Sequence, residues 1–463
     1  MNTAAEPLAI ERLAANAVET TFDRFDAATV EITIRRIIDT LGCTIGGSGD
    51  TGNPEIVALM KDQGGKPEST IIIDGTKVPA GSAAFVNCIM TRSFDFEPVS
   101  PLVDGVNTPG HISGTTVPTA LAMAEATGAS GRDLMTALLV GDDIAARILA
   151  ASGFGFTLGW DGVGTVNVFG ATAIAGRLLG LTRRQMQHAF GLCLQMQGTT
   201  FQTIWDGTTA FKLPQGLAGQ QGILSAQLAK AGWTGPTDAL FSKFGYYNMF
   251  TEGAQKPEYL TKKLGEVYYY DGITKPYPAC RITHAPIDAS LAIIHKNRLT
   301  ADDVRNVNLD LAQGGIDHKC GHPFVAGDNP HGNAAFSFQY TVASAFLNGK
   351  VTPAQFSPAS LGDPRLPEFF KKITLTAVDD VPFEGARVTV TTTDGRTFTE
   401  QVDVASGNPL ENPIDADAVL AKFWNNVDYN GKLGREKATK LLSLLEKLDK
   451  VDDVRKLMPF LVA

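Results

Sequence analysis

The hydrophobic pattern of the sequence changes near residue 272, and this change limits the possible folds more than any other feature. Up to about residue 250, apolar residues recur at helical spacing, as in AATVEITIRRIIDTLGCTIGG, which ends on a Gly-Gly pair. Beyond residue 272, VRNVNLDL and KITLTAV alternate as strands do. RVTVTTTDGRTFTEQVDV places two β-rich runs around Asp394-Gly395, a strong hairpin signal. The sequence therefore predicts a helical region followed by an α+β region.

Several helices of the first region carry start, stop and contact signals. SGRDLMTALLVGDDIAARILAA opens with Ser130 and has Asp133 three positions later, which resembles a capping box. Further helices are predicted over residues 167–180, 182–197 and 217–232. These stretches are rich in Gly and Ala, which allow helix axes to approach closely. Their apolar stripes are interpreted as core-packing faces.

The second region is bounded by a return to helical patterning at the end of the chain. APIDASLAIIHKN and GNAAFSFQYTVASAFLNG predict helices among the strands, and residues 415–429 and 434–457 predict two more. The last helices most economically rejoin the first helical region. We therefore predict a mainly α fold: a large, discontinuous all-helical domain (residues 1–272 and 409–463) plus a smaller α+β domain (residues 273–408).

Charge and cysteine content narrow the class of partner. The net charge is −9 and no Lys/Arg run occurs, so neither nucleic acid nor an anionic membrane surface is an expected partner. The most apolar stretch is interrupted by Asp142 and Asp143 and cannot span a bilayer. The first residues lack the pattern of a signal peptide, and the five cysteines are scattered without a Cys-x-x-Cys pair. A cytoplasmic protein with reduced thiols is expected.

Motifs for cofactors and metals are weak or absent. No GxGxxG follows a strand, and neither GxxxxGK[ST] nor the nucleophile elbow GxSxG occurs. DHKCGHPF gathers Asp317, His318, Cys320 and His322, but no second ligand cluster completes a four-coordinate zinc site. We interpret that stretch as a polar loop beside a domain cleft. Neither a cofactor nor a metal is predicted.

Two proline-stiffened stretches carry the residues best suited to chemistry. RSFDFEPVSPLVDGVNTPGHISG holds Asp95, Glu97 and His111, and carboxylates and imidazole are the usual groups of general acid–base catalysis. KPYPACRITH offers Lys275, Arg281 and His284, which together suit an anionic group. Taken singly, each residue could equally be a turn former or a satisfied structural group.

Taken together, these stretches and several others resemble the MmgE/PrpD family, which includes 2-methylcitrate dehydratase, cis-aconitate decarboxylase and iminodisuccinate epimerase. The resemblance rests on DTLGCTIGG, FDFE, GHISGTTVPTALAMAEATGASGRD, GWDGVGTVNVFGATAIAGRLLGLT, LPQGLAGQQGILSAQLAKAGWTGP and KPYPACRITHAPIDASL. It covers nearly the whole chain. The family resemblance implies an all-helical domain plus a smaller α+β domain, usually in a homodimer, with the site between the domains.

The resemblance also implies roles for particular residues. Asp95 and His111 match the acid–base pair of the family, and Tyr340 matches a tyrosine that donates a proton or contacts substrate. Asp161 stands where the family has a histidine. The residues implied in substrate binding are Lys275, which would hold a substrate carboxylate, Lys212, close to the position of a family lysine, and the supporting residues Arg281 and His284.

Three functions remain open at this stage. The first is a cofactor-independent lyase that abstracts the proton α to a carboxylate of a small di- or tricarboxylic acid and eliminates water or carbon dioxide. The second is an epimerase or isomerase of a substituted succinate, which uses the same carbanion-like intermediate and Asp161 as the second acid. The third is a non-catalytic member of the family that keeps the fold.

Overall fold

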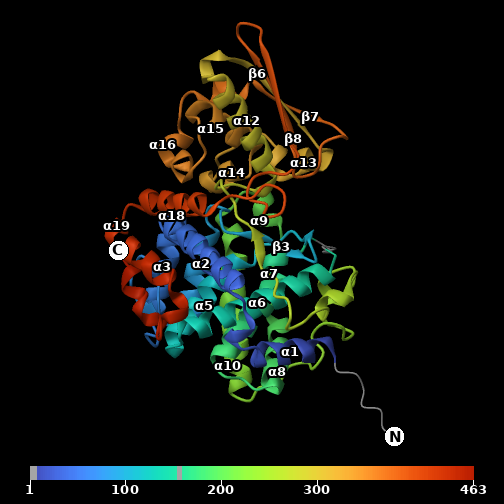
Figure 1. The fold of residues 1–463 in the computed structure, drawn as a ribbon, viewed down its shortest axis with the longest axis vertical. Helices are drawn as coiled ribbons and strands as arrows, with labels where there is room; N and C mark the ends of the chain where they lie inside the picture. The colour runs from blue at the N-terminus through green and yellow to red at the C-terminus, as the bar shows by residue number, and fades with distance from the viewer. Residues whose placement is uncertain (1–7, 154–158) are drawn as a thin grey trace.

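The computed structural model describes residues 8–153 and 159–463, which form a larger helical domain and a smaller α+β domain (Figure 1). The predicted fold class is confirmed. The smaller domain lies at one end of the molecule, and the C-terminal helices return to the larger one. Among the described residues, no helix combines the length and apolarity needed to cross a membrane.

The helical domain is built from long helices joined by short connections. Its helices are α1 (Ala9–Glu19), α2 (Ala27–Gly47), α3 (Asn53–Gln63), α4 (Ala80–Arg92), α5 (Ser113–Thr127), α6 (Gly131–Ala151), α7 (Gly162–Leu178), α8 (Arg183–Cys193), α9 (Gln202–Trp205), α10 (Leu213–Lys230) and α11 (Tyr246–Phe250). Short 3₁₀ turns are η1 (Phe22–Arg24), η2 (Leu194–Met196), η3 (Thr209–Lys212) and η4 (Pro257–Leu260).

Local signals explain where these helices begin and how closely they pack. The predicted capping box at the start of α6 is present, with the Ser130 side chain accepting from the Asp133 backbone N–H. Helices α6 and α7 cross where Gly141 faces Gly170. A Cβ atom at Gly141 would lie 2.7 Å from the Gly170 carbonyl oxygen, so a larger residue there would separate the helices. The small residues of this region therefore serve close packing.

The helical domain also contains short strands, which differs from the all-helical expectation. β1 (Ser69–Thr70) pairs with β2 (Lys77–Val78), and β3 (Val99–Val103) pairs with β4 (Val106–Asn107) and β5 (Asp271–Ile273). The β3–β5 pairing is long-range, and strands this short have too little alternation to be seen in sequence. The pairing of β3 with β5 joins the proline-rich loop to the segment that leads into the α+β domain.

The α+β domain contains a four-stranded sheet of order β7-β6-β8-β9. Its strands are β6 (Val304–Leu311), β7 (Ile373–Ala377), β8 (Ala386–Thr392) and β9 (Thr397–Val402). β6 and β7 are parallel, whereas β8 pairs antiparallel with both β6 and β9. The hairpin predicted around Asp394-Gly395 is confirmed, because these residues connect β8 to β9.

Helices cover this sheet and connect its strands. They are α12 (His284–Asn297), α13 (Gln313–Asp317), α14 (Pro330–Ala335), α15 (Phe338–Asn348), α16 (Pro358–Leu361) and α17 (Leu366–Phe370), with 3₁₀ turns η5 (Arg281–Thr283), η6 (Ala301–Asp303), η7 (Lys319–Gly321) and η8 (Pro353–Phe356). The single helix predicted over GNAAFSFQYTVASAFLNG is two helices. Ser337 is extended between them and caps α15 by accepting from the Tyr340 N–H.

The C-terminal segment packs against the first helices of the chain. α18 (Ala416–Asn430) and α19 (Arg435–Leu445) lie beside α2 (Figure 1), followed by the turns η9 (Leu448–Lys450), η10 (Val454–Lys456) and η11 (Met458–Phe460). One hydrophobic core contains Leu41, Leu138, Phe423 and Leu441. We keep the domain division at 272/273 and 408/409 as a proposal; its first boundary falls within β5.

Candidate active site

A cavity of about 490 Å³ lies between the two domains. The helical domain contributes the loop after α4, the residues before α5, the start of α7 and helix α9. The α+β domain contributes Cys280, Arg281 and Ile282 and the pair Phe383-Glu384. Its volume suits a small organic molecule.

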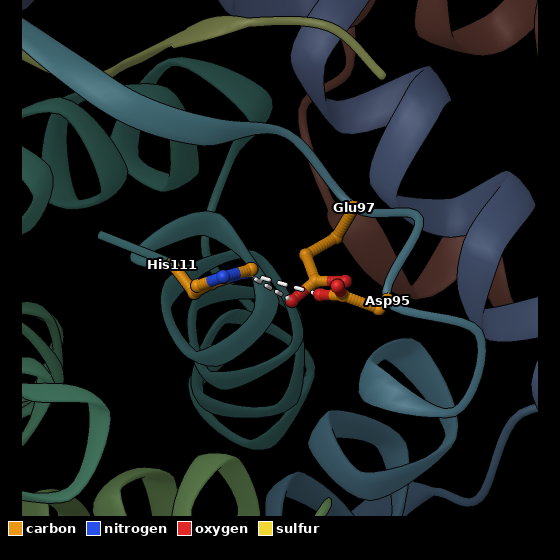
Figure 2. Close-up of side chains that lie close together, drawn as sticks. All are labelled: Asp95, Glu97 and His111. Carbon is orange, nitrogen blue, oxygen red and sulfur yellow. Dashed lines mark hydrogen bonds and ion pairs between the residues drawn. The ribbon is translucent and has the colours of Figure 1, made fainter. Parts of the chain in front are cut away.

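The loop after α4 gathers a compact charged cluster at this cavity. Arg92, the last residue of α4, contacts Asp95 and lies 3.0 Å from Glu97 Oε1, both through Nη1. The same nitrogen lies 2.9 Å from His111 Nδ1. Figure 2 shows His111 directed toward the two carboxylates. Both carboxylates are buried, so their charges are balanced by protein cations rather than by water.

Asp95 is fixed by its backbone as well as by its side chain. Its φ is +48°, a left-handed conformation that is uncommon for residues other than glycine. Lys275 Nζ holds both ends of the residue, at 2.7 Å from the carbonyl oxygen and 3.0 Å from Oδ1. Burial would raise the pKa of Asp95, but the charges of Arg92 and Lys275 hold it well below its usual range. Asp95 therefore stays ionised and is a poor proton carrier.

The Glu97–His111 pair has the arrangement of a carboxylate that orients a general base. Burial would raise the pKa of Glu97, but Arg92 and the hydrogen bond from His111 lower it to about 2. His111 Nδ1 lies 3.0 Å from this ionised carboxylate and 2.9 Å from Arg92 Nη1, which can only donate. Because the N–H groups of Arg92 Nη1 already have Asp95 and Glu97 as acceptors, we assign the ring proton to Nδ1, toward Glu97, and the lone pair to Nε2. The ring of His111 makes its contacts within residues 8–153 and 159–463 through Nδ1, which leaves Nε2 without a partner there, and the side chain is 24% exposed on the cavity wall. Burial and then the charge of Arg92 lower the pKa of His111, so the imidazole is neutral at neutral pH.

Side chains from three other elements fix the backbone around His111. Asn167 and Gln215 donate amide hydrogen bonds to its carbonyl oxygen, at 2.7 and 3.0 Å. Asp271 Oδ2 accepts from the next two backbone N–H groups, those of Ile112 and Ser113, at 2.9 and 2.6 Å. Burial raises the pKa of Asp271 to about 7. The imidazole is thus held on a rigid backbone, as proton transfer at carbon requires.

Asp161 is a further titratable group on the cavity wall. It is the N-cap of α7, and its Oδ1 accepts from the Val163 N–H at 2.9 Å. Burial raises the pKa of Asp161, against the opposing effects of that hydrogen bond and of the charge of Arg92. A carboxyl with a raised pKa and an imidazole with a lowered pKa face one cavity, which suits a pair that exchanges protons.

Lys275 and Arg281 lie close to the cavity, but other groups of the protein already bind both side chains. Lys275 is fully buried against Asp95 and is not among the residues that line the cavity. Arg281 does line it, yet its Nη1 and Nη2 donate at 2.7 Å to the carbonyl oxygens of Ser406 and Ala405. Lys275 thus neutralises Asp95, and Arg281 supplies positive charge to the wall.

Lys212, His284 and Tyr340 do not line the cavity, and the site proposed below leaves them out. Lys212 Nζ donates to Asp50 Oδ2 at 2.8 Å and to two further oxygens. His284 Nε2 pairs with the Ala279 carbonyl at 3.0 Å within the α+β domain. The Tyr340 hydroxyl donates to the Gln355 carbonyl at 2.5 Å, so it is occupied inside the core. Local partners therefore occupy the polar groups of Lys212 and Tyr340, whereas the buried Nδ1 of His284 has no hydrogen-bond partner among the described residues.

Sequence reasoning missed the roles of several residues that complete the site. Arg92 and Glu97 flank Asp95, and a basic residue at the end of an apolar helix beside a pair of acids is a signal that could have identified Arg92. Asn167, Gln215 and Asp271 carry no local signal, because each meets His111 only through the tertiary fold.

One group in the described chain has the composition of a metal site. Ligand atoms of Asp95, Glu97 and His111 lie within 4.8 Å of one another. However, Arg92 Nη1 already lies between these three side chains and supplies a positive charge there. A metal ion would have to displace the guanidinium, so the residues present do not fit a metal. The DHKCGHPF stretch forms no such cluster among the described residues.

The fold and the site together define a two-domain protein with an acid–base cavity between a helical and an α+β domain. Comparison with known families agrees with this description. The MmgE/PrpD N-terminal domain matches residues 11–258, and the MmgE/PrpD C-terminal domain matches residues 277–449. The chain belongs to the MmgE/PrpD family. Membership supports a dehydratase- or lyase-like protein without fixing a substrate or reaction. No curated protein matches the chain.

Proposed function

We propose that the protein is a cofactor-independent lyase that removes the proton α to a carboxylate of a small carboxylic acid with two or more carboxylates. The observation that carries the proposal is the Glu97–His111 pair. Its neutral imidazole keeps Nε2 unpartnered among the described residues, on the wall of the interdomain cavity. This is the arrangement of a general base held by a carboxylate, and family membership supports the same class of reaction.

Each step of the proposed reaction uses a group on the cavity wall. His111 Nε2 takes the α-proton, and the electron pair of the broken C–H bond moves onto the substrate carboxylate. The resulting aci-carboxylate group carries two negative charges, and the positive charges of Arg92 and Arg281 on the wall help to stabilise it. The pair then forms the carbon–carbon double bond as the β-hydroxyl leaves, protonated by Asp161, as water. The raised pKa of Asp161 favours its role as the acid.

A second candidate, epimerisation of a substituted succinate, is favoured by the same property of Asp161. The first step is unchanged. If no β-group leaves, the carboxyl of Asp161 returns a proton to the α-carbon from a different part of the cavity wall. The intermediate is shared, so the two reactions differ only in the fate of the electron pair.

Proton NMR in deuterium oxide tests the proposal and separates the two candidates. The purified protein is incubated with citrate, 2-methylcitrate, cis-aconitate, tartrate and substituted succinates. We expect one acid to lose its α-proton signal while a vinyl resonance appears, which marks a lyase. Deuterium incorporation or diastereomer interconversion without a vinyl product would instead mark an epimerase. An unchanged spectrum for every acid, with binding shown for at least one, would favour the non-catalytic alternative.

Replacing Glu97 tests its role through the pH dependence of kcat/KM. The base must be neutral, so activity rises as the pH rises through the pKa of His111. Glu97 raises that pKa through its hydrogen bond and charge, so Glu97→Gln should move this acid limb to lower pH and reduce the plateau by about 10-fold. Asp104→Asn is a matched control, since Asp104 lies on the same loop but outside the cavity. A shift of the limb to higher pH would contradict the assignment.

The cytoplasmic location and the homodimer remain predictions from sequence and from the family resemblance. Sedimentation of the purified protein measures the second directly, with a mass of twice the 49.3 kDa chain expected.

A further inference from the structure

The cavity beside His111 has a largely apolar wall that the proposed proton transfer does not require. Phe201, Ile204 and Trp205 come from the α9 region of the helical domain. Ile282, Phe336 and Phe383 come from the α+β domain. Aromatic and branched side chains from both domains therefore meet around one space of about 490 Å³. A wall of this kind gains free energy by covering an apolar group of a ligand.

The charged groups on the wall nearly balance one another. Among the described residues, the lining cations are Arg92, Arg281 and Lys319, and the lining carboxylates are Asp95, Asp161 and Glu384. With Asp161 protonated, as its role as the acid requires, and with neutral histidines, three positive and two negative charges leave the wall a net charge of +1.

Each of these cations also has a partner within the protein. Arg92 forms ion pairs with Asp95 and Glu97, and Lys319 Nζ donates to the Trp205 carbonyl at 2.8 Å. Arg281 donates to two backbone carbonyls, and its Nε lies 3.7 Å from Glu384 Oε2. Little positive charge remains to offset the desolvation of a compact tricarboxylate such as citrate.

We infer that the substrate of this site is a dicarboxylic acid carrying a bulky apolar substituent, an aryl or branched alkyl group, rather than a compact tricarboxylate. The inference rests on the proposed function, because it places one carboxylated carbon beside His111. The remainder of the molecule lies against the apolar wall formed by both domains. The substituent supplies the binding free energy that free cations would supply for a more highly charged acid.

Binding of matched acids to the full-length protein tests the inference by isothermal titration calorimetry. The probes are 2-benzylsuccinate, 2-methylsuccinate and citrate. The first two have the same charge and differ only in apolar area. We expect 2-benzylsuccinate to bind at least ~10-fold more tightly than 2-methylsuccinate, and citrate to bind more weakly than 2-benzylsuccinate. Equal affinities for the two succinates, or tightest binding of citrate, would overturn the inference.

Two variants at the wall and one away from it make the test specific. Trp205 and Phe383 are 43% and 53% exposed, so truncating them should leave the core intact. Trp205→Ala and Phe383→Ala should each weaken the binding of 2-benzylsuccinate about 5-fold or more and change the binding of 2-methylsuccinate little. Phe244→Ala is the matched control, because Phe244 is 68% exposed and lies outside the cavity lining. If the wall variants weakened the binding of both acids equally, the result would count against the inference.

Failure of the inference is distinguishable from failure of the proposed function. The α-proton of each bound acid is followed by NMR in deuterium oxide in parallel. Tight binding of 2-benzylsuccinate with no reaction or exchange of any acid would support the apolar preference and reject proton abstraction. If the α-proton of a compact tricarboxylate exchanged and the two succinates bound equally well, the results would support proton abstraction and reject the apolar preference. No binding of any probe would reject the inference.

Discussion

His111→Asn should lower turnover by at least about 10²-fold, because it removes the base that accepts the α-proton. Asn keeps polar atoms near Glu97 but has no group that titrates near neutral pH. The side chain is partly exposed, and Asn167, Gln215 and Asp271 hold the neighbouring backbone through main-chain contacts that the substitution keeps. We therefore expect a change in unfolding free energy of about 1 kcal/mol or less.

The control for this variant is His295→Asn. His295 is exposed in the last turn of α12 and contacts the Gly349 carbonyl, away from the cavity. Its substitution should leave both turnover and stability unchanged. Turnover of His111→Asn close to that of the unaltered protein would remove His111 from the mechanism, and a large loss of stability would mean that its role is structural.

Arg92→Met should lower the free energy of unfolding by about 3–5 kcal/mol, measured by urea denaturation, because it leaves buried carboxylates without their main partner. Arg92 contacts Asp95, Glu97 and His111 and is itself buried. Arg35→Met is a matched control, since Arg35 pairs with Glu31 on the surface and should contribute about 1 kcal/mol or less. Similar losses in the two variants would contradict the account of the cluster.

The same variant should also change the acid stability of the protein. The pKa values of Asp95 and Glu97 are depressed in the folded state, that of Glu97 to about 2. The stability that they contribute is present above their unfolded values of about 4 and is lost as the pH falls through the folded values. Removing Arg92 raises the folded values, so acid unfolding should begin at higher pH in Arg92→Met.

The parts of the fold that depend on local signals could be predicted from sequence. The capping box of α6 and the β8–β9 turn at Asp394-Gly395 act within a few residues, and the structure has both. The break between α14 and α15 was missed because helical spacing continues across Ser337, although its side chain caps the second helix. The β3–β5 pairing was missed because its two strands are short and lie far apart in sequence.

The candidate site was predictable to a similar extent. Sequence placed Asp95, His111, Asp161 and Arg281 in one site, and all four line the cavity. It also expected Lys212 there, but Asp50, 162 residues away in sequence, binds the Lys212 ammonium elsewhere. A residue type suggests a chemistry, whereas the direction of a side chain depends on partners brought together by the fold.

The most direct test of the central claim is α-proton exchange by His111 itself. Proton NMR in deuterium oxide would follow the α-proton of the same acid with the unaltered protein and with His111→Asn. Each sample would contain enough protein to bind all of the acid. We predict rapid loss of the signal with the unaltered protein and a rate at least about 10²-fold slower with the variant. Equal rates in the two proteins would contradict the claim that His111 removes this proton.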